Sequence, residues 1–104
     1  MPTEYDKLVR DDIPAVIEAD GKQPVTHIVE GEPYEQRLFE KLTEESAELR
    51  EDRSAAELAD VLELLDAIQA ALGIEDEELE RIREEKAAAR GRFDDGVVLE
   101  RVDD

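Results

Sequence analysis

Two pairs of acidic residues share a spacing that could hold a metal ion. Glu45 and Glu48 form one pair, and Glu57 and Asp60 form the other. Residues three apart lie on one face of a helix, so two facing helices would bring four carboxylates together. Such a cluster repels itself unless a cation neutralises it, and oxygen-only ligands suit Mg²⁺ or Mn²⁺. The spacing therefore predicts a site for a hard divalent cation.

The elements that must position these pairs are two adjacent helices, and each has an apolar stripe. Glu45 and Glu57 fall on these stripes, where a charged side chain needs a partner because burying a lone charge is costly. Glu45 belongs to the stripe Leu38, Leu42, Glu45 and Leu49, and Glu57 begins the stripe Glu57, Val61, Leu64 and Ile68. The positions of the two glutamates strengthen the prediction of a cation site.

Simpler interpretations stay open for several of these residues. Ser54 and Glu57 fit a capping box, in which the serine caps the helix and the glutamate bonds back to the serine amide. Glu44, next to the first pair, is also consistent with a plain surface residue. Lys7 and Arg10 are two of few cations, and they would either meet phosphate oxygens or pair with neighbouring acids.

Composition excludes several classes of function. The net charge of −18 argues against a nucleic acid polymer or an anionic membrane as partner. Four Lys against nine Arg in so acidic a chain resembles proteins adapted to high salt, where screening relieves self-repulsion. Cysteine is absent, which excludes disulfides and thiolate zinc sites. The length of 104 residues predicts a single domain, and no leader or long apolar run is found, which predicts a cytoplasmic protein.

The periodicity predicts a mainly α-helical fold, a bundle of four to five helices. Helices are expected at about residues 13–19, 34–51, 55–72 and 76–90, with Gly21, Gly73 and Gly91 as C-terminal caps. Two β-like runs, residues 24–30 and 97–102, could pair into a short two-stranded ribbon. The helix at 55–72 is apolar almost all round, which indicates a central position or a subunit interface.

The motifs together resemble those of the MazG-like, all-α nucleoside triphosphate pyrophosphatase superfamily. The resemblance is carried by Lys41-Leu-x-Glu44-Glu45-x-x-Glu48 and Glu57-Leu-Ala-Asp60-Val. The flanking segments at 5–14, 72–74 and 86–93 are similar to a small single-domain branch labelled phosphoribosyl-ATP pyrophosphohydrolase-like. The chain departs from that branch at Asp12, where Lys is common, and at Arg92, where a second Gly is common.

The resemblance implies a homodimeric or homotetrameric enzyme that uses Mg²⁺, or Mn²⁺, to cleave a nucleotide between its α and β phosphates. It implies Glu45, Glu48, Glu57 and Asp60 as metal ligands, and Glu44 with Glu45 as the catalytic carboxylates. Glu44 would either contact the metal ligands without touching the metal itself, or act as the base that takes a proton from the attacking water. The implied phosphate-binding residues are Lys7, Arg10, Lys41, Lys86 and Arg90. Hydrolysis of phosphoribosyl-ATP in histidine synthesis, and a non-catalytic metal-binding helical module, remain the alternatives.

Overall fold

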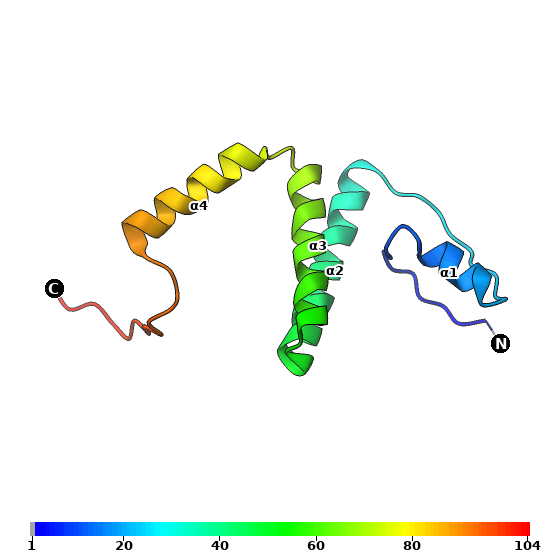
Figure 1. Cartoon of the computed structure of the whole chain (residues 1–104), viewed down its shortest axis with the longest axis horizontal. Coiled ribbons are helices and arrows are strands. Elements are labelled where there is room, and N and C mark those ends of the chain that lie inside the picture. The colour runs from blue at the N-terminus through cyan, green and yellow to red at the C-terminus, as the bar shows by residue number, and fades with distance from the viewer. Residues whose placement is uncertain (1) are drawn as a thin grey trace. The chain divides into compact units, whose positions relative to one another are not determined.

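The computed structural model describes residues 2–104, and within them the chain is all-α (Figure 1). In chain order the helices are α1 (Ile13–Ala19), α2 (Gly31–Asp52), α3 (Ala55–Ala71) and α4 (Asp76–Arg90). The predicted all-α class is confirmed, and the described residues form four helices where four to five were predicted. Predicted and observed bounds differ most at the start of α2, which begins at Gly31 rather than near Tyr34. Pro33 falls in its first turn, where a missing N–H costs the helix no hydrogen bond.

The chain divides into two compact units, one ending at Leu72 and the other beginning at Gly73. The first unit contains α1, α2 and α3, and the second contains α4 and the C-terminal segment. Gly73 has φ +69°, a left-handed conformation that glycine adopts without strain at the end of a helix. The single-domain organisation expected from chain length stays a prediction.

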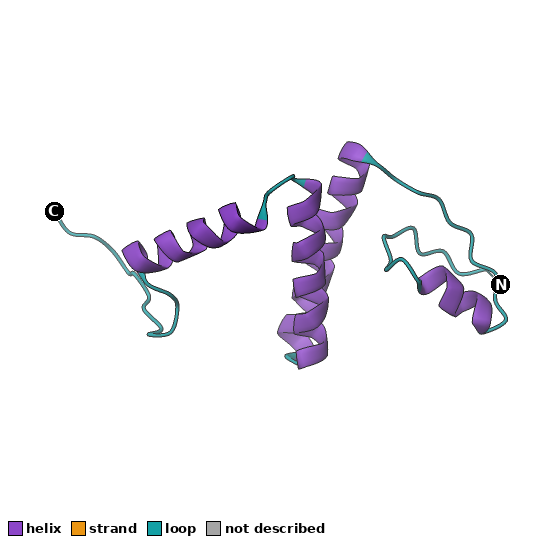
Figure 2. Cartoon of the chain, turned by 45° about the horizontal axis from the view of Figure 1, so that its top comes forward, coloured by secondary structure: helices purple, strands orange, loops and turns teal. Residues whose placement is uncertain are grey.

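The first unit is built on the packing of α2 against α3, which lie side by side in both cartoon views (Figure 2). The apolar stripes predicted on the two helices supply the contact. Leu38 of α2 is 2% exposed and Ile68 of α3 is 9% exposed, and both lie on these stripes. Glu45 lies on the same α2 stripe and is 7% exposed, so a carboxylate is buried in the seam between the helices.

A two-residue link turns the chain sharply from α2 into α3. Arg53 caps the end of α2 with a left-handed conformation, φ 45°, and its backbone N–H donates to the Leu49 carbonyl at 2.8 Å. Ser54 then caps α3, because its Oγ accepts a hydrogen bond from the Glu57 N–H at 3.2 Å. The Ser54 cap is confirmed, whereas the break between the helices, predicted at Asp52-Arg53, lies at Arg53-Ser54.

The predicted β ribbon is wrong, because no strand forms anywhere in residues 2–104. The runs 24–30 and 97–102 are extended segments without regular structure, and they belong to different units. Most of their apolar side chains are exposed, with Val25 at 99% and Val97 at 86%. β-Branched residues favour an extended backbone, but an isolated two-stranded ribbon needs a layer to pack against. Neither segment buries the apolar face that would supply one.

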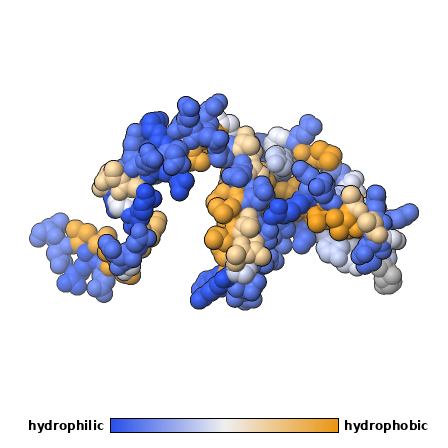
Figure 3. Space-filling view, viewed as in Figure 1, coloured by the Kyte–Doolittle hydropathy of each residue, from blue (hydrophilic) through white to orange (hydrophobic). Residues whose placement is uncertain are grey.

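A second apolar face runs along α3 beside the one that packs on α2. Its members are Leu58, Leu62 and Leu65 of α3 and Leu72, the residue that caps the C-terminus of α3, and each is about half exposed. Figure 3 shows apolar surface over the helix pair, whereas the surface over α4 is mostly polar.

Within the described residues, no helix is long and apolar enough to cross a membrane.

Candidate metal centre

Five carboxylates from α2 and α3 converge on one side of the helix pair. One oxygen from each of Glu44, Glu45 and Glu48 lies within 4.8 Å of the others, and the same holds for Glu45, Glu57 and Asp60. Glu45 therefore belongs to both groups. All four predicted metal ligands, together with Glu44, are gathered in this carboxylate cluster, which comprises Glu44, Glu45, Glu48, Glu57 and Asp60.

The sequence fixes this convergence through local structure. The i,i+3 spacing aligns the acidic residues of each helix, and the two-residue link places the start of α3 against the last turns of α2. The Ser54 cap sets the first turn of α3, so that Glu57 lies on the seam near Glu45. A short, capped connection thus determines which carboxylates face each other.

Two oxygens of the cluster are buried without any hydrogen-bond partner. They are Oε2 of Glu45 and Oε2 of Glu57. A buried carboxylate oxygen without a partner loses its hydration and gains nothing in exchange, which is strongly unfavourable. These two atoms and the oxygen-only donor set fit a hard divalent cation such as Mg²⁺ or Mn²⁺. For Glu57, the unpartnered oxygen favours a ligand role over a capping role alone.

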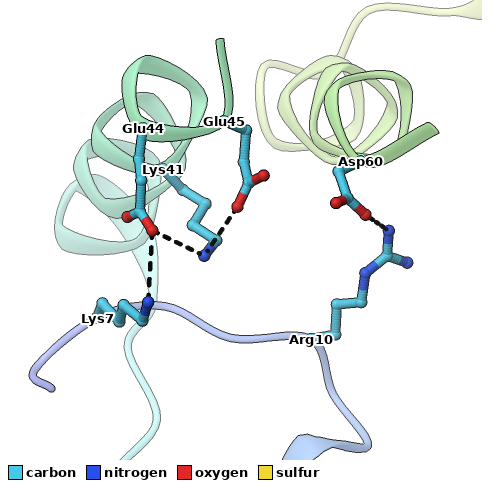
Figure 4. A network of polar contacts seen from close by, with 6 residues as sticks. All are labelled: Lys7, Arg10, Lys41, Glu44, Glu45 and Asp60. Atoms are coloured by element: carbon cyan, nitrogen blue, oxygen red, sulfur yellow. Dashed lines mark hydrogen bonds and ion pairs between the residues drawn. The ribbon is translucent and has the colours of Figure 1, made fainter. Parts of the chain in front are cut away.

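Three basic side chains approach the same cluster (Figure 4). Lys41 Nζ lies 3.2 Å from Glu45 Oε1 and 3.6 Å from Glu44 Oε1. Lys7 Nζ lies 3.4 Å from Glu44 Oε1, and Arg10 Nη2 donates to Asp60 Oδ1 at 2.7 Å. The Lys41 side chain is only 19% exposed, whereas those of Lys7 and Arg10 are 41% and 56% exposed. The cluster therefore has an inner cation on α2 and two outer cations from the N-terminal segment.

Mutual repulsion and burial change the pKa values within the cluster. Hydrogen bonding with Glu45 raises the pKa of Glu48, and the negative charge of Glu45 raises it further. Desolvation raises the pKa of Glu57, and the charges of Asp60 and Glu45 add to the effect. The pKa of Arg10 is raised by its hydrogen bond to Asp60. The protonated forms of Glu48 and Glu57 are therefore favoured relative to free glutamate, whereas the charged form of Arg10 is favoured.

The predicted phosphate-binding residues fall into two sets. Lys7, Arg10 and Lys41 lie at the carboxylate cluster, where each pairs with an acid. Lys86 and Arg90 lie on α4, in the second unit, and their role stays a prediction. Sequence reasoning did not identify Arg37, which binds Asp6 from 31 positions away. A single contact across that separation leaves no periodic signal in the sequence.

No protein-family model matches the chain, and neither does any curated protein or solved structure. The resemblance drawn from the motifs therefore stays a prediction.

The raised pKa values predict how stability depends on pH when divalent cations are removed with EDTA. Because the folded state holds protons on Glu48 and Glu57 more tightly than the unfolded state, the proton-linked stability is complete below the ordinary glutamate pKa. It is lost as pH rises through the raised pKa values. Glu48→Gln should therefore increase the free energy of unfolding at neutral pH, and the gain should vanish in acid. Urea unfolding followed by circular dichroism measures both.

Glu40→Gln is the matched control for that experiment, because it removes one negative charge from an exposed position of the same helix. General relief of repulsion would stabilise both variants equally. Equal increases in the free energy of unfolding would contradict a strained carboxylate cluster, whereas a larger increase in Glu48→Gln supports it.

Proposed function

We propose that the protein is a Mg²⁺-dependent nucleotide pyrophosphohydrolase that cleaves the α–β phosphate bond of a nucleoside triphosphate, standard or non-standard. The observation that carries the proposal is the pair of buried, unpartnered carboxylate oxygens of Glu45 and Glu57, beside three basic side chains. Glu45, Glu48, Glu57 and Asp60 would hold the cation. The motif resemblance supports the same assignment.

Acids and bases have separate roles in this chemistry. When bound, Mg²⁺ would polarise the phosphoryl oxygens and neutralise the leaving pyrophosphate. The Glu44 side chain is 37% exposed, so it can contact a water molecule and accept its proton as that water attacks phosphorus. The attacked atom is the α phosphorus. Its bond to the oxygen that bridges to the β phosphate then breaks, releasing monophosphate and pyrophosphate. Lys7, Arg10 and Lys41 would bind the phosphate oxygens.

A divalent cation also reconciles the net charge of the protein with the charge of its substrate. A chain of net charge −18 repels a polyphosphate at long range, and only local positive charge reverses that repulsion. The three basic side chains at the cluster supply part of that charge, and the bound cation would supply the rest. This favours a small phosphorylated substrate over a nucleic acid polymer.

Substitution of the ligands tests the proposal. Glu48→Gln and Asp60→Asn should each lower pyrophosphate release by about 100-fold or more, because each removes a negative ligand from the cation. Release is measured with a coupled pyrophosphate assay in Mg²⁺, and circular dichroism checks that helix content is retained. Glu40→Gln should keep full activity as the matched control. Full activity in both ligand variants would refute the assignment of the site.

A substrate panel separates the alternatives. Phosphoribosyl-ATP and a set of standard and non-standard nucleoside triphosphates are assayed side by side, at low and high salt. We expect turnover of a nucleoside triphosphate, with activity that persists at high salt. Turnover of phosphoribosyl-ATP alone would instead indicate a role in histidine synthesis. Calorimetric binding of Mg²⁺ or Mn²⁺ without turnover of any substrate would indicate a non-catalytic helical module.

The proposed enzyme acts as a homo-oligomer, with the second apolar face of α3 as the interface. Four leucines about half exposed on one helix face are more than a monomer of this size usually leaves uncovered: Leu58, Leu62, Leu65 and Leu72. Burying such a face in a second copy removes the exposed half of each leucine from water, at roughly 0.7–1.5 kcal/mol per side chain, about half the value for a fully exposed leucine. The face contains no residue of the carboxylate cluster, so assembly through it leaves the site accessible.

Leu62→Glu tests this interface. A charge at the centre of the face should raise the dissociation constant of the oligomer by at least about tenfold, because the variant interface no longer buries this leucine. Sedimentation velocity over a range of concentrations measures the change. Val16→Glu, at an exposed position of α1, is the control and should leave the oligomer intact. A wild-type protein that remains monomeric at high concentration would contradict the proposal.

A further inference from the structure

The N-terminal segment 5–10 reaches both helices that carry the carboxylate cluster, although it contains no helix or strand. Lys7 contacts Glu44 of α2, and Arg10 contacts Asp60 of α3. Figure 4 shows both basic side chains pointing from this one segment toward the two helices. These contacts join residues 37 and 50 positions apart, so they are a tertiary feature of the first unit. We call residues 5–10 the strap.

A separate contact fixes the strap to α2. Arg37 Nη1 donates to the Asp6 backbone carbonyl at 2.8 Å, and Arg37 Nη2 donates to Asp6 Oδ1 at 3.1 Å. Asp6 has φ 44°, a left-handed turn that aspartate tolerates better than most residues. The anchor lies one helical turn before Lys41 and uses no carboxylate of the cluster. It can therefore persist when the contacts of Lys7 and Arg10 change.

The strap and a divalent cation would draw on the same negative charge. Arg10 binds Asp60 Oδ1 and Lys7 binds Glu44 Oε1, at the exposed side of the cluster. The buried Oε2 atoms of Glu45 and Glu57 have no partner. A cation bound through those oxygens and Asp60 would repel the guanidinium of Arg10, because both carry positive charge at close range. The phosphates of a substrate would offer that guanidinium a new partner.

We propose that the strap is a built-in counter-ion that exchanges partners during the binding cycle. Before a divalent cation binds, Lys7 and Arg10 neutralise Glu44 and Asp60. After cation and substrate bind, they transfer to the phosphate oxygens, while the Arg37–Asp6 anchor holds the strap on α2. This inference rests on the proposed function, because it requires a cation at the cluster and a polyphosphate beside it.

The exchange predicts opposite effects on two ligands, measured by calorimetry on the full chain. Lys7→Gln and Arg10→Gln should each tighten Mn²⁺ binding by roughly two- to fivefold, because each removes a positive charge close to the cation and Arg10→Gln also frees the ligand Asp60. The same variants should weaken binding of inorganic pyrophosphate, at saturating Mn²⁺, by about tenfold, because a charge-assisted hydrogen bond is lost. Arg37→Gln should weaken pyrophosphate binding although both strap cations remain.

Lys22→Gln and Arg101→Gln are the matched controls, since each removes one exposed positive charge that is not part of the strap. They should leave both affinities close to those of the wild type. If Lys7→Gln and Arg10→Gln weaken the binding of both Mn²⁺ and pyrophosphate, the strap only supports the fold and the exchange is refuted. If they behave like the controls while the wild type binds Mn²⁺, the exchange fails and the proposed function stands. If the wild type does not bind Mn²⁺, the proposed function fails, and the strap proposal fails with it.

Discussion

The structure of the first unit depends on negative charge placed where an apolar contact would normally be. α2 and α3 pack along stripes that include Glu45 and Glu57, and both glutamates have a buried oxygen without a partner. Hydrophobic contacts such as Leu38 and Ile68 hold the helices together, but they cannot compensate carboxylates on the same seam. A helix pair of this composition is understandable if the cost of the charge is recovered when a cation binds, since binding energy then becomes folding energy.

The basic side chains at the cluster show why the pair holds together before any ligand binds. Lys41 comes from α2 itself, so its contact with Glu45 requires no long-range organisation. Lys7 and Arg10 come from the N-terminal segment, and they bring the two helices and that segment into one network. Because these outer pairs are exposed and screened by solvent, they are weak enough to exchange. The inner pair is shielded and would be more persistent.

Much of this arrangement could be predicted from the sequence, because it depends on local rules. Helix periodicity located the four helices, and i,i+3 spacing on two adjacent helices predicted the convergence of Glu45, Glu48, Glu57 and Asp60. The β ribbon was predicted wrongly, because β-branched residues signal an extended backbone without specifying a partner strand. The Arg37–Asp6 anchor was missed for a related reason: one contact between distant segments has no repeating pattern.

The division of the cluster into buried and exposed oxygens links fold to function. Oxygens on the seam are shielded by the helices, so water cannot fully solvate them and a cation is the partner that suits them best. Oxygens at the rim are already paired with basic side chains, and a bound cation would leave these side chains with less negative charge, although Arg10 also has Glu63 at 3.8 Å. A phosphate group would restore that charge, and a neutral ligand would not. Under the proposed function, the same helix pair would bind a hard cation and would favour a phosphorylated substrate, although the protein as a whole is strongly acidic.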